Sequence, residues 1–126
     1  MRREIFQPTE EQEQAAVFQW ADLMSEQIPE LTLLLHIPNG GLRSKTEAVR
    51  FKRVGVKPGV PDLFLPVVRN GYHGLWIEMK RQKGGKLSGI QAAWLAELNN
   101  QGYLAVCCHG ADEAIGILSR YLEVKV

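Results

Sequence analysis

Two oppositely charged residues, Glu78 and Lys80, interrupt an apolar run at positions 75–80. Side chains two positions apart on a strand lie on the same face, so Glu78 and Lys80 would point one way and Met79 the other, into a core. Asp62 follows a proline and begins a second short apolar segment. If the two segments are neighbouring strands, the carboxyl groups of Asp62 and Glu78 approach each other and either share a proton or hold a cation.

A pair of carboxylates of this kind suits a hard divalent cation. Oxygen ligands favour Mg²⁺ or Mn²⁺, and the chain has no cluster of cysteines or histidines at the spacing of a zinc site. Phosphodiester hydrolysis needs an activated water, charge neutralisation on the phosphate and help for the leaving oxygen, and a bound cation contributes to all three. Lys80 would position or deprotonate the water, or stabilise the developing charge; the sequence leaves these roles open.

The elements that must bring the two acids together form a predicted hairpin. Asp62–Leu65 has the composition of a compact strand, and Asn70-Gly71 is typical of a tight hairpin turn. Leu75–Lys80 can then return beside residues 62–68 as an antiparallel strand. His36, by contrast, is expected only to end a buried strand, because no second histidine lies at metal spacing.

Capping and turn signals predict the rest of the fold. The expected elements are a helix over Glu10–Gln27, a strand over Leu31–Ile37, a short basic helix between Ser44 and Gly55, the two strands of the hairpin, a helix from Ser88 to Gly102 with Ile90, Trp94, Leu95 and Leu98 inward, a strand over Tyr103–Cys108, and a last helix packed through Ala114, Ile117, Leu118 and Tyr121. This order, α-β-α-β-β-α-β-α, predicts an α/β fold with a mixed sheet flanked by helices on both faces. The length of 126 residues predicts a single domain over residues 1–126.

Positive charge is concentrated in one part of a chain whose net charge is only +1. The segment 43–57 carries a single acid, and the residues expected there to contact the phosphates of a nucleic acid are Arg43, Lys45, Lys52, Arg53 and Lys57. Clustered cations can form a phosphate-attracting face on a nearly neutral protein. Charge alone is equally compatible with ordinary solvated helix and loop residues.

Composition also bears on location. No apolar run approaches the roughly 20 residues that cross a bilayer, and the first residues do not resemble a signal peptide, so we expect a cytoplasmic protein. The two cysteines, Cys107 and Cys108, are adjacent and are expected to be reduced strand residues.

Three motifs together resemble a known family. The sequence Gly55-Val-Lys-Pro-Gly-Val-Pro-Asp62, then Glu78-Met-Lys80, then Ser88-Gly-Ile-Gln91 is similar to the motif series of VRR-NUC domains, a branch of the PD-(D/E)XK nucleases, in the stand-alone form typical of phage and prophage genes. The resemblance implies a restriction-endonuclease-like fold and a Mg²⁺- or Mn²⁺-dependent DNA endonuclease in the cytoplasm of a bacterial host. It further implies selectivity for branched DNA such as four-way junctions, and assembly as a homodimer.

The same resemblance assigns roles to individual residues. Asp62 and Glu78 would be metal ligands, the main-chain carbonyl of Met79 a third ligand, and Lys80 the catalytic lysine. Gln91 matches a family glutamine, although its place in a capping box after Ser88 explains it equally well.

The family also places a glutamate of the first helix at the metal. Glu13 is preferred over Glu10 and Glu11, because the first turn of a helix attracts acids for its dipole alone, whereas Glu13 lies at the edge of the inward face. Glu10 is the second choice.

Two other functions remain as alternatives. The first is a noncatalytic nucleic-acid-binding module of the same fold, which the intact Asp62, Glu78 and Lys80 disfavour. The second is a hydrolase of small phosphate esters; the chain lacks the glycine-rich loop and following Lys-Ser/Thr of nucleotide hydrolases.

Overall fold

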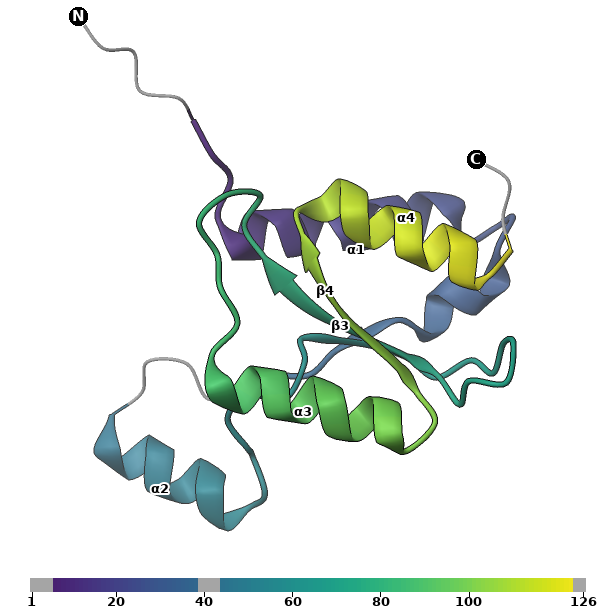
Figure 1. The fold of residues 1–126 in the computed structure, drawn as a ribbon. Coiled ribbons are helices and arrows are strands. Elements are labelled where there is room, and N and C mark those ends of the chain that lie inside the picture. Colours follow the sequence, from purple (N-terminus) through teal and green to yellow (C-terminus); the bar gives the residue numbers. More distant parts are fainter. Residues whose placement is uncertain (1–5, 39–43, 124–126) are drawn as a thin grey trace, which may run out of the picture.

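The computed structural model describes residues 6–38 and 44–123 of the chain (Figure 1). Its elements are helix α1 (Glu10–Met24), the 3₁₀ helix η1 (Pro29–Leu33), strand β1 (Leu35–His36), helix α2 (Lys45–Arg53), strands β2 (Leu63–Leu65) and β3 (Leu75–Lys80), helix α3 (Gly89–Asn100), strand β4 (Leu104–His109) and helix α4 (Ala111–Tyr121). The predicted capping boxes at Thr9 and Ser88 are both present. Across this described part, every helix is too short or too polar to cross a membrane.

The four strands form one mixed sheet in the order β1-β2-β3-β4. β1 and β2, like β2 and β3, pair antiparallel, whereas β3 and β4 pair parallel because α3 carries the chain back across the sheet. The predicted turn between β2 and β3 is confirmed: Asn70 and Gly71 have φ of 50° and 83°, the left-handed conformation of a tight hairpin turn. The sheet therefore brings together segments distant in sequence.

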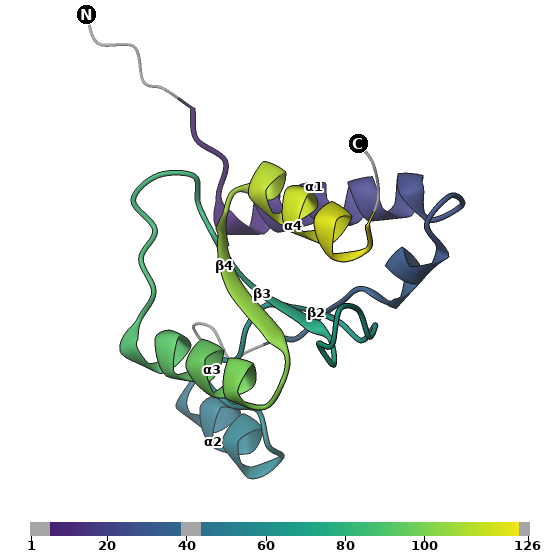
Figure 2. The ribbon, with the colours of Figure 1, turned by 45° about the vertical axis from the view of Figure 1, so that its right-hand side comes forward.

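Helices cover both faces of the sheet, as the sequence predicts (Figures 1 and 2). α1 and α4 lie together on one face and α3 lies on the other. α2 projects beyond α3, and none of its residues is buried. The sheet and three helices thus form the body of the protein, with α2 as a peripheral element.

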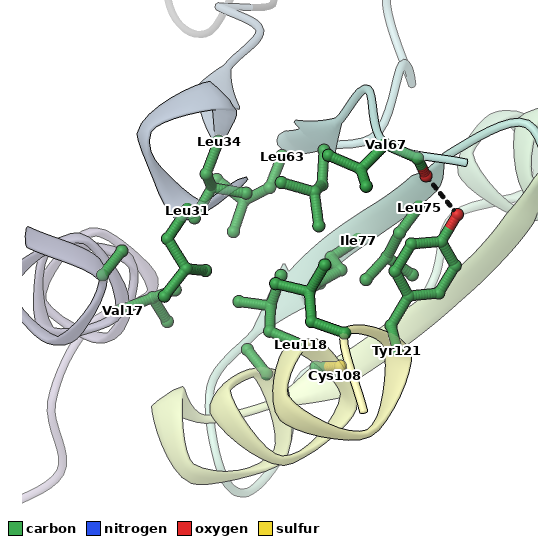
Figure 3. Close-up of a cluster of buried hydrophobic side chains, with 14 of the residues drawn as sticks. Val17, Leu31, Leu34, Leu63, Val67, Leu75, Ile77, Cys108, Leu118 and Tyr121 are labelled. Carbon is green, nitrogen blue, oxygen red and sulfur yellow. Dashed lines mark hydrogen bonds between the residues drawn. The ribbon is translucent and has the colours of Figure 1, made fainter. Parts of the chain in front are cut away.

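The main core lies between the sheet and the pair formed by α1 and α4 (Figure 3). Ile77 and Met79 are fully buried there, which confirms that alternate residues of β3 point into the core. Leu118 of α4 is also fully buried. The hydroxyl of Tyr121 donates to the carbonyl of Val67 at 2.5 Å and ties the end of α4 to the segment after β2.

The predicted strand over Leu31–Ile37 is wrong for most of its length. Pro29 begins η1, Thr32 Oγ1 donates to the carbonyl of Pro29 at 2.7 Å, and Leu31 and Leu34 are buried while the residues between them are exposed. Burial every third residue is the pattern of a 3₁₀ helix. An almost uninterrupted apolar sequence hides this period, so the strand shortens to Leu35–His36.

Ile90, which the helical pattern predicts to point inward, lies on the surface. Ile90 is 55% exposed, whereas Leu95 on the same helix is buried. Ile90 lies over the turn that contains Gly59: a β-carbon on Gly59 would lie 2.3 Å from Ile90 Cγ2. Gly59 also has φ of +85°, so both its conformation and its packing require glycine. The start of α3 therefore packs on the turn that precedes Asp62.

Candidate active site

The β2–β3 hairpin places Asp62 and Glu78 in contact. Leu63 pairs with Ile77, so the preceding Asp62 lies beside the next residue of β3, Glu78. The side chains of the two acids are hydrogen-bonded to each other. Oδ2 of Asp62 accepts from the backbone N–H of Met79 at 2.8 Å. The neighbouring strand therefore holds the Asp62 carboxyl group in a defined orientation.

Glu78 is a buried acid with an unsatisfied oxygen. The residue is 2% exposed, and its Oε1 has no hydrogen-bond partner among the described residues. Burial, followed by the hydrogen bond with Asp62 and the charge of Asp62, raises the pKa of Glu78 to about 9, although the Lys80 charge acts in the opposite direction. With its pKa raised in this way, Glu78 holds a proton at neutral pH. A cation between the acids would replace that proton.

Lys80 brings its amine to the same region. The residue is only 7% exposed, and Nζ lies 3.9 Å from Oε1 of Glu10, whose side chain is 48% exposed. The stem is covered by the loop after β3, where a β-carbon on Gly85 would lie 3.1 Å from Lys80 Cβ. The positive charge is thus held at the boundary between the interior and solvent, beside an acid.

Of the first-helix acids, the structure brings Glu10 rather than the preferred Glu13 to Lys80. The charge of Glu10 also raises the pKa of Glu78, so Glu10 is electrostatically coupled to both residues. Glu13 is 5% exposed, and its Oε1 accepts from the backbone N–H of Ala111 at 3.2 Å. This bond satisfies an N–H at the start of α4, so Glu13 has a structural role that the sequence did not reveal. Glu11 is exposed.

Gln91 is held in the capping box of α3. Its side chain accepts from the N–H of Ser88 at 3.0 Å, and its own N–H donates to Ser88 Oγ at 3.2 Å. Gln91 also lines a groove of about 620 Å³ between α2 and the start of α3. The sequence predicted the capping box but not the groove. Other residues along the groove are Ala48, Phe51, Val56, Pro58 and Ile90.

The predicted phosphate-binding residues lie mainly on α2. Lys45, Lys52 and Arg53, named here the α2 cations, are all exposed, and Lys57 is exposed in the following turn. Arg43 lies outside the described residues. Lys52 and Lys57 line the groove beside α3, while Lys45 and Arg53 stand at the two ends of α2.

His36 contacts Asp62, which the sequence did not predict. The residue is exposed instead of ending a buried strand, and its Nδ1 lies 2.8 Å from the main-chain oxygen of Asp62. Spacing in the sequence could not reveal this, because the contact depends on the pairing of β1 with β2.

A cation at this site would need oxygen ligands from both side chains and the main chain. Within residues 6–38 and 44–123, no group of three or more His, Cys, Asp or Glu is arranged to bind a metal ion. The Asp62–Glu78 pair still fits a cation, because both side chains offer hard oxygen donors and the buried Oε1 of Glu78 has no hydrogen-bond partner in the described part of the chain.

Two comparisons with known proteins point to one domain family. A family model described as the VRR-NUC domain matches residues 2–112. A solved structure described as a VRR_NUC domain protein is 31% identical, covers 95% of this chain and 93% of its own, and superposes with a TM-score of 0.81. No curated protein sequence matches the chain. The similarity extends from the first-helix acids to the start of α4.

Proposed function

The chain belongs to the VRR-NUC domain family of nuclease domains, and we propose that it is a DNA endonuclease whose divalent cation is held by Asp62 and Glu78. The observation that carries the proposal is the contact between these two acids, in which a buried oxygen of Glu78 has no hydrogen-bond partner among residues 6–38 and 44–123. Both donors are hard oxygens, which favours Mg²⁺ or Mn²⁺.

The main chain supports a third oxygen ligand at the same place. In an antiparallel pair the N–H and C=O of one residue face the same neighbouring strand. The N–H of Met79 donates to Asp62, so its carbonyl also lies on the Asp62 side of β3. The proposed ligands are therefore the carboxylates of Asp62 and Glu78 and the carbonyl of Met79.

The other site residues would act on the phosphate and the water. When bound, the cation supplies Lewis acidity and lowers the pKa of a water molecule. Lys80 keeps its ammonium group beside the acid pair, where it can stabilise negative charge developing on the phosphate. Glu10 orients that ammonium through the 3.9 Å contact. We assign the helix acid of the site to Glu10, and Glu13 to the capping of α4.

The substrate would be positioned by charge. The α2 cations and Lys57 are exposed on the side of α3, where they can contact phosphates without reading bases. Selectivity for branched DNA and assembly as a homodimer, both implied by the family, stay predictions. Gln91 keeps two proposed roles, the helix cap and a contact to substrate.

The direct test is cleavage of linear, nicked, flap and four-way-junction DNA by the purified chain. Wild type should cut in Mg²⁺ or Mn²⁺ and stop in EDTA, while Asp62→Asn and Lys80→Ala should be inactive. Glu26→Gln, which changes an exposed acid in the turn after α1, is the matched control and should cut like wild type. Equal cleavage by wild type and Asp62→Asn would refute the proposed site. If wild type and every variant bound DNA but none cut it, the noncatalytic nucleic-acid-binding module would be favoured.

A further inference from the structure

Asp62 is held from both neighbouring strands. On the β3 side, the N–H of Met79 binds its carboxyl group. On the β1 side, its main-chain carbonyl accepts from the N–H of Ile37 and lies against Nδ1 of His36, each at 2.8 Å. Pro61, which is buried, fixes the main chain just before it. The carboxyl group and the main chain of Asp62 are therefore both held in place, and together they determine where the carboxylate points.

The tautomer of His36 follows from this contact. A carbonyl oxygen can only accept a hydrogen bond, so Nδ1 of His36 must carry the hydrogen. The neutral Nδ1–H form and the protonated ring both satisfy this requirement, so the bond is independent of the charge of His36.

We propose that His36 is a positioning residue for the cation site: its Nδ1–H holds the Asp62 main chain so that the Asp62 carboxylate stays against Glu78. The inference rests on the proposed cation site. His36 is exposed and therefore contributes little to the hydrophobic core. Core packing does not explain why its ring is hydrogen-bonded to the carbonyl of Asp62. Groups that orient metal ligands typically change metal affinity by about 10- to 100-fold when removed. The N–H of Ile37 still holds the carbonyl without His36, so the lower end, about tenfold, is expected here.

Three substitutions of His36 separate the two ring nitrogens. In the full chain, His36→Asn keeps an N–H donor near the position of Nδ1, His36→Gln places its donor near Nε2, and His36→Ala has neither. Mn²⁺ alone is the probe, measured by titration calorimetry, with the urea midpoint of the metal-free protein measured in parallel. His73→Ala removes another exposed histidine, from the loop before β3, and serves as the matched control.

We expect His36→Ala and His36→Gln to bind Mn²⁺ about tenfold more weakly than wild type, while His36→Asn and His73→Ala bind it normally. The metal-free midpoints of all variants should match. The inference would be overturned if His36→Ala bound Mn²⁺ as tightly as wild type, or if His36→Gln bound it normally and His36→Asn did not. Neither result would count against the proposed cation site. A loss of affinity matched by a lower metal-free midpoint would show a merely structural role. If wild type itself binds no Mn²⁺, the proposed cation site fails and the role of His36 fails with it.

Discussion

Replacing Glu78 by glutamine is expected to remove the pH dependence of cation binding. In the metal-free chain, burial and the contact with Asp62 raise the pKa of Glu78 to about 9. Well below that pH Glu78 holds a proton, and a cation at the proposed site would replace it. Cation binding must expel this proton, and glutamine, which cannot ionise, has no proton to lose.

The size of the effect follows from the pKa. At pH 7 only about 1% of a group with this pKa is ionised, so binding should release close to one proton per cation. The apparent association constant should rise about tenfold for each unit of pH between 6 and 8. The stability of the metal-free protein should change in the opposite direction. Between the ordinary pKa of 4.5 and the folded value of about 9, the folded chain holds more protons than the unfolded one, so its free energy of unfolding should fall as the pH rises.

Calorimetric titration of Mn²⁺ in two buffers with different ionisation enthalpies counts the released protons directly. Wild type should release close to one proton at pH 7, and Glu78→Gln should bind weakly with none. Glu26→Gln should release the same number as wild type. If wild type released no proton, or bound Mn²⁺ equally well at pH 6 and pH 8, the reasoning from the buried acid pair would be refuted.

Three further predictions concern other parts of the molecule. Reversing the charges of the α2 cations together should flatten the dependence of DNA affinity on salt by about two to three units of log–log slope, measured by fluorescence anisotropy; an unchanged slope would exclude them as phosphate contacts. Tyr121→Phe should lower the free energy of unfolding by about 1–2 kcal/mol, because the carbonyl of Val67 loses its partner, and an unaltered urea midpoint would contradict this. Glu13→Ala should lower the free energy of unfolding by about 1 kcal/mol, because the N–H of Ala111 at the start of α4 loses its partner. Glu10→Gln should slow cleavage and leave the free energy of unfolding nearly unchanged. If Glu13→Ala slowed cleavage and Glu10→Gln lowered stability instead, the helix acid of the site would be Glu13.

Local signals predicted the hairpin that carries Asp62 and Glu78 well. The Asn70-Gly71 turn and the alternation in Leu75–Lys80 are short-range features, and both elements formed as expected. Once the register is set, the contact between Asp62 and Glu78 follows from it. The mixed sheet and its covering helices could be predicted for the same reason, since the caps at Thr9 and Ser88 mark the helices clearly.

Features that depend on tertiary packing could not be predicted in this way. Glu10 and Glu13 lie one turn apart on α1, and only the placement of α4 decides that Glu13 meets Ala111 while Glu10 meets Lys80. The contact of His36 with Asp62 likewise requires the pairing of β1 with β2.

The peripheral position of α2 has a consequence for the evolution of such a protein. None of its side chains is buried, so replacing them exposes no core and leaves the hairpin with its acids untouched. In the proposed function, α2 would contact the nucleic acid and the hairpin would carry the chemistry of cutting it, so the two tasks would fall to separate parts of the chain. New target preferences could therefore arise by substitutions in one helix, while the cleavage machinery is inherited unaltered.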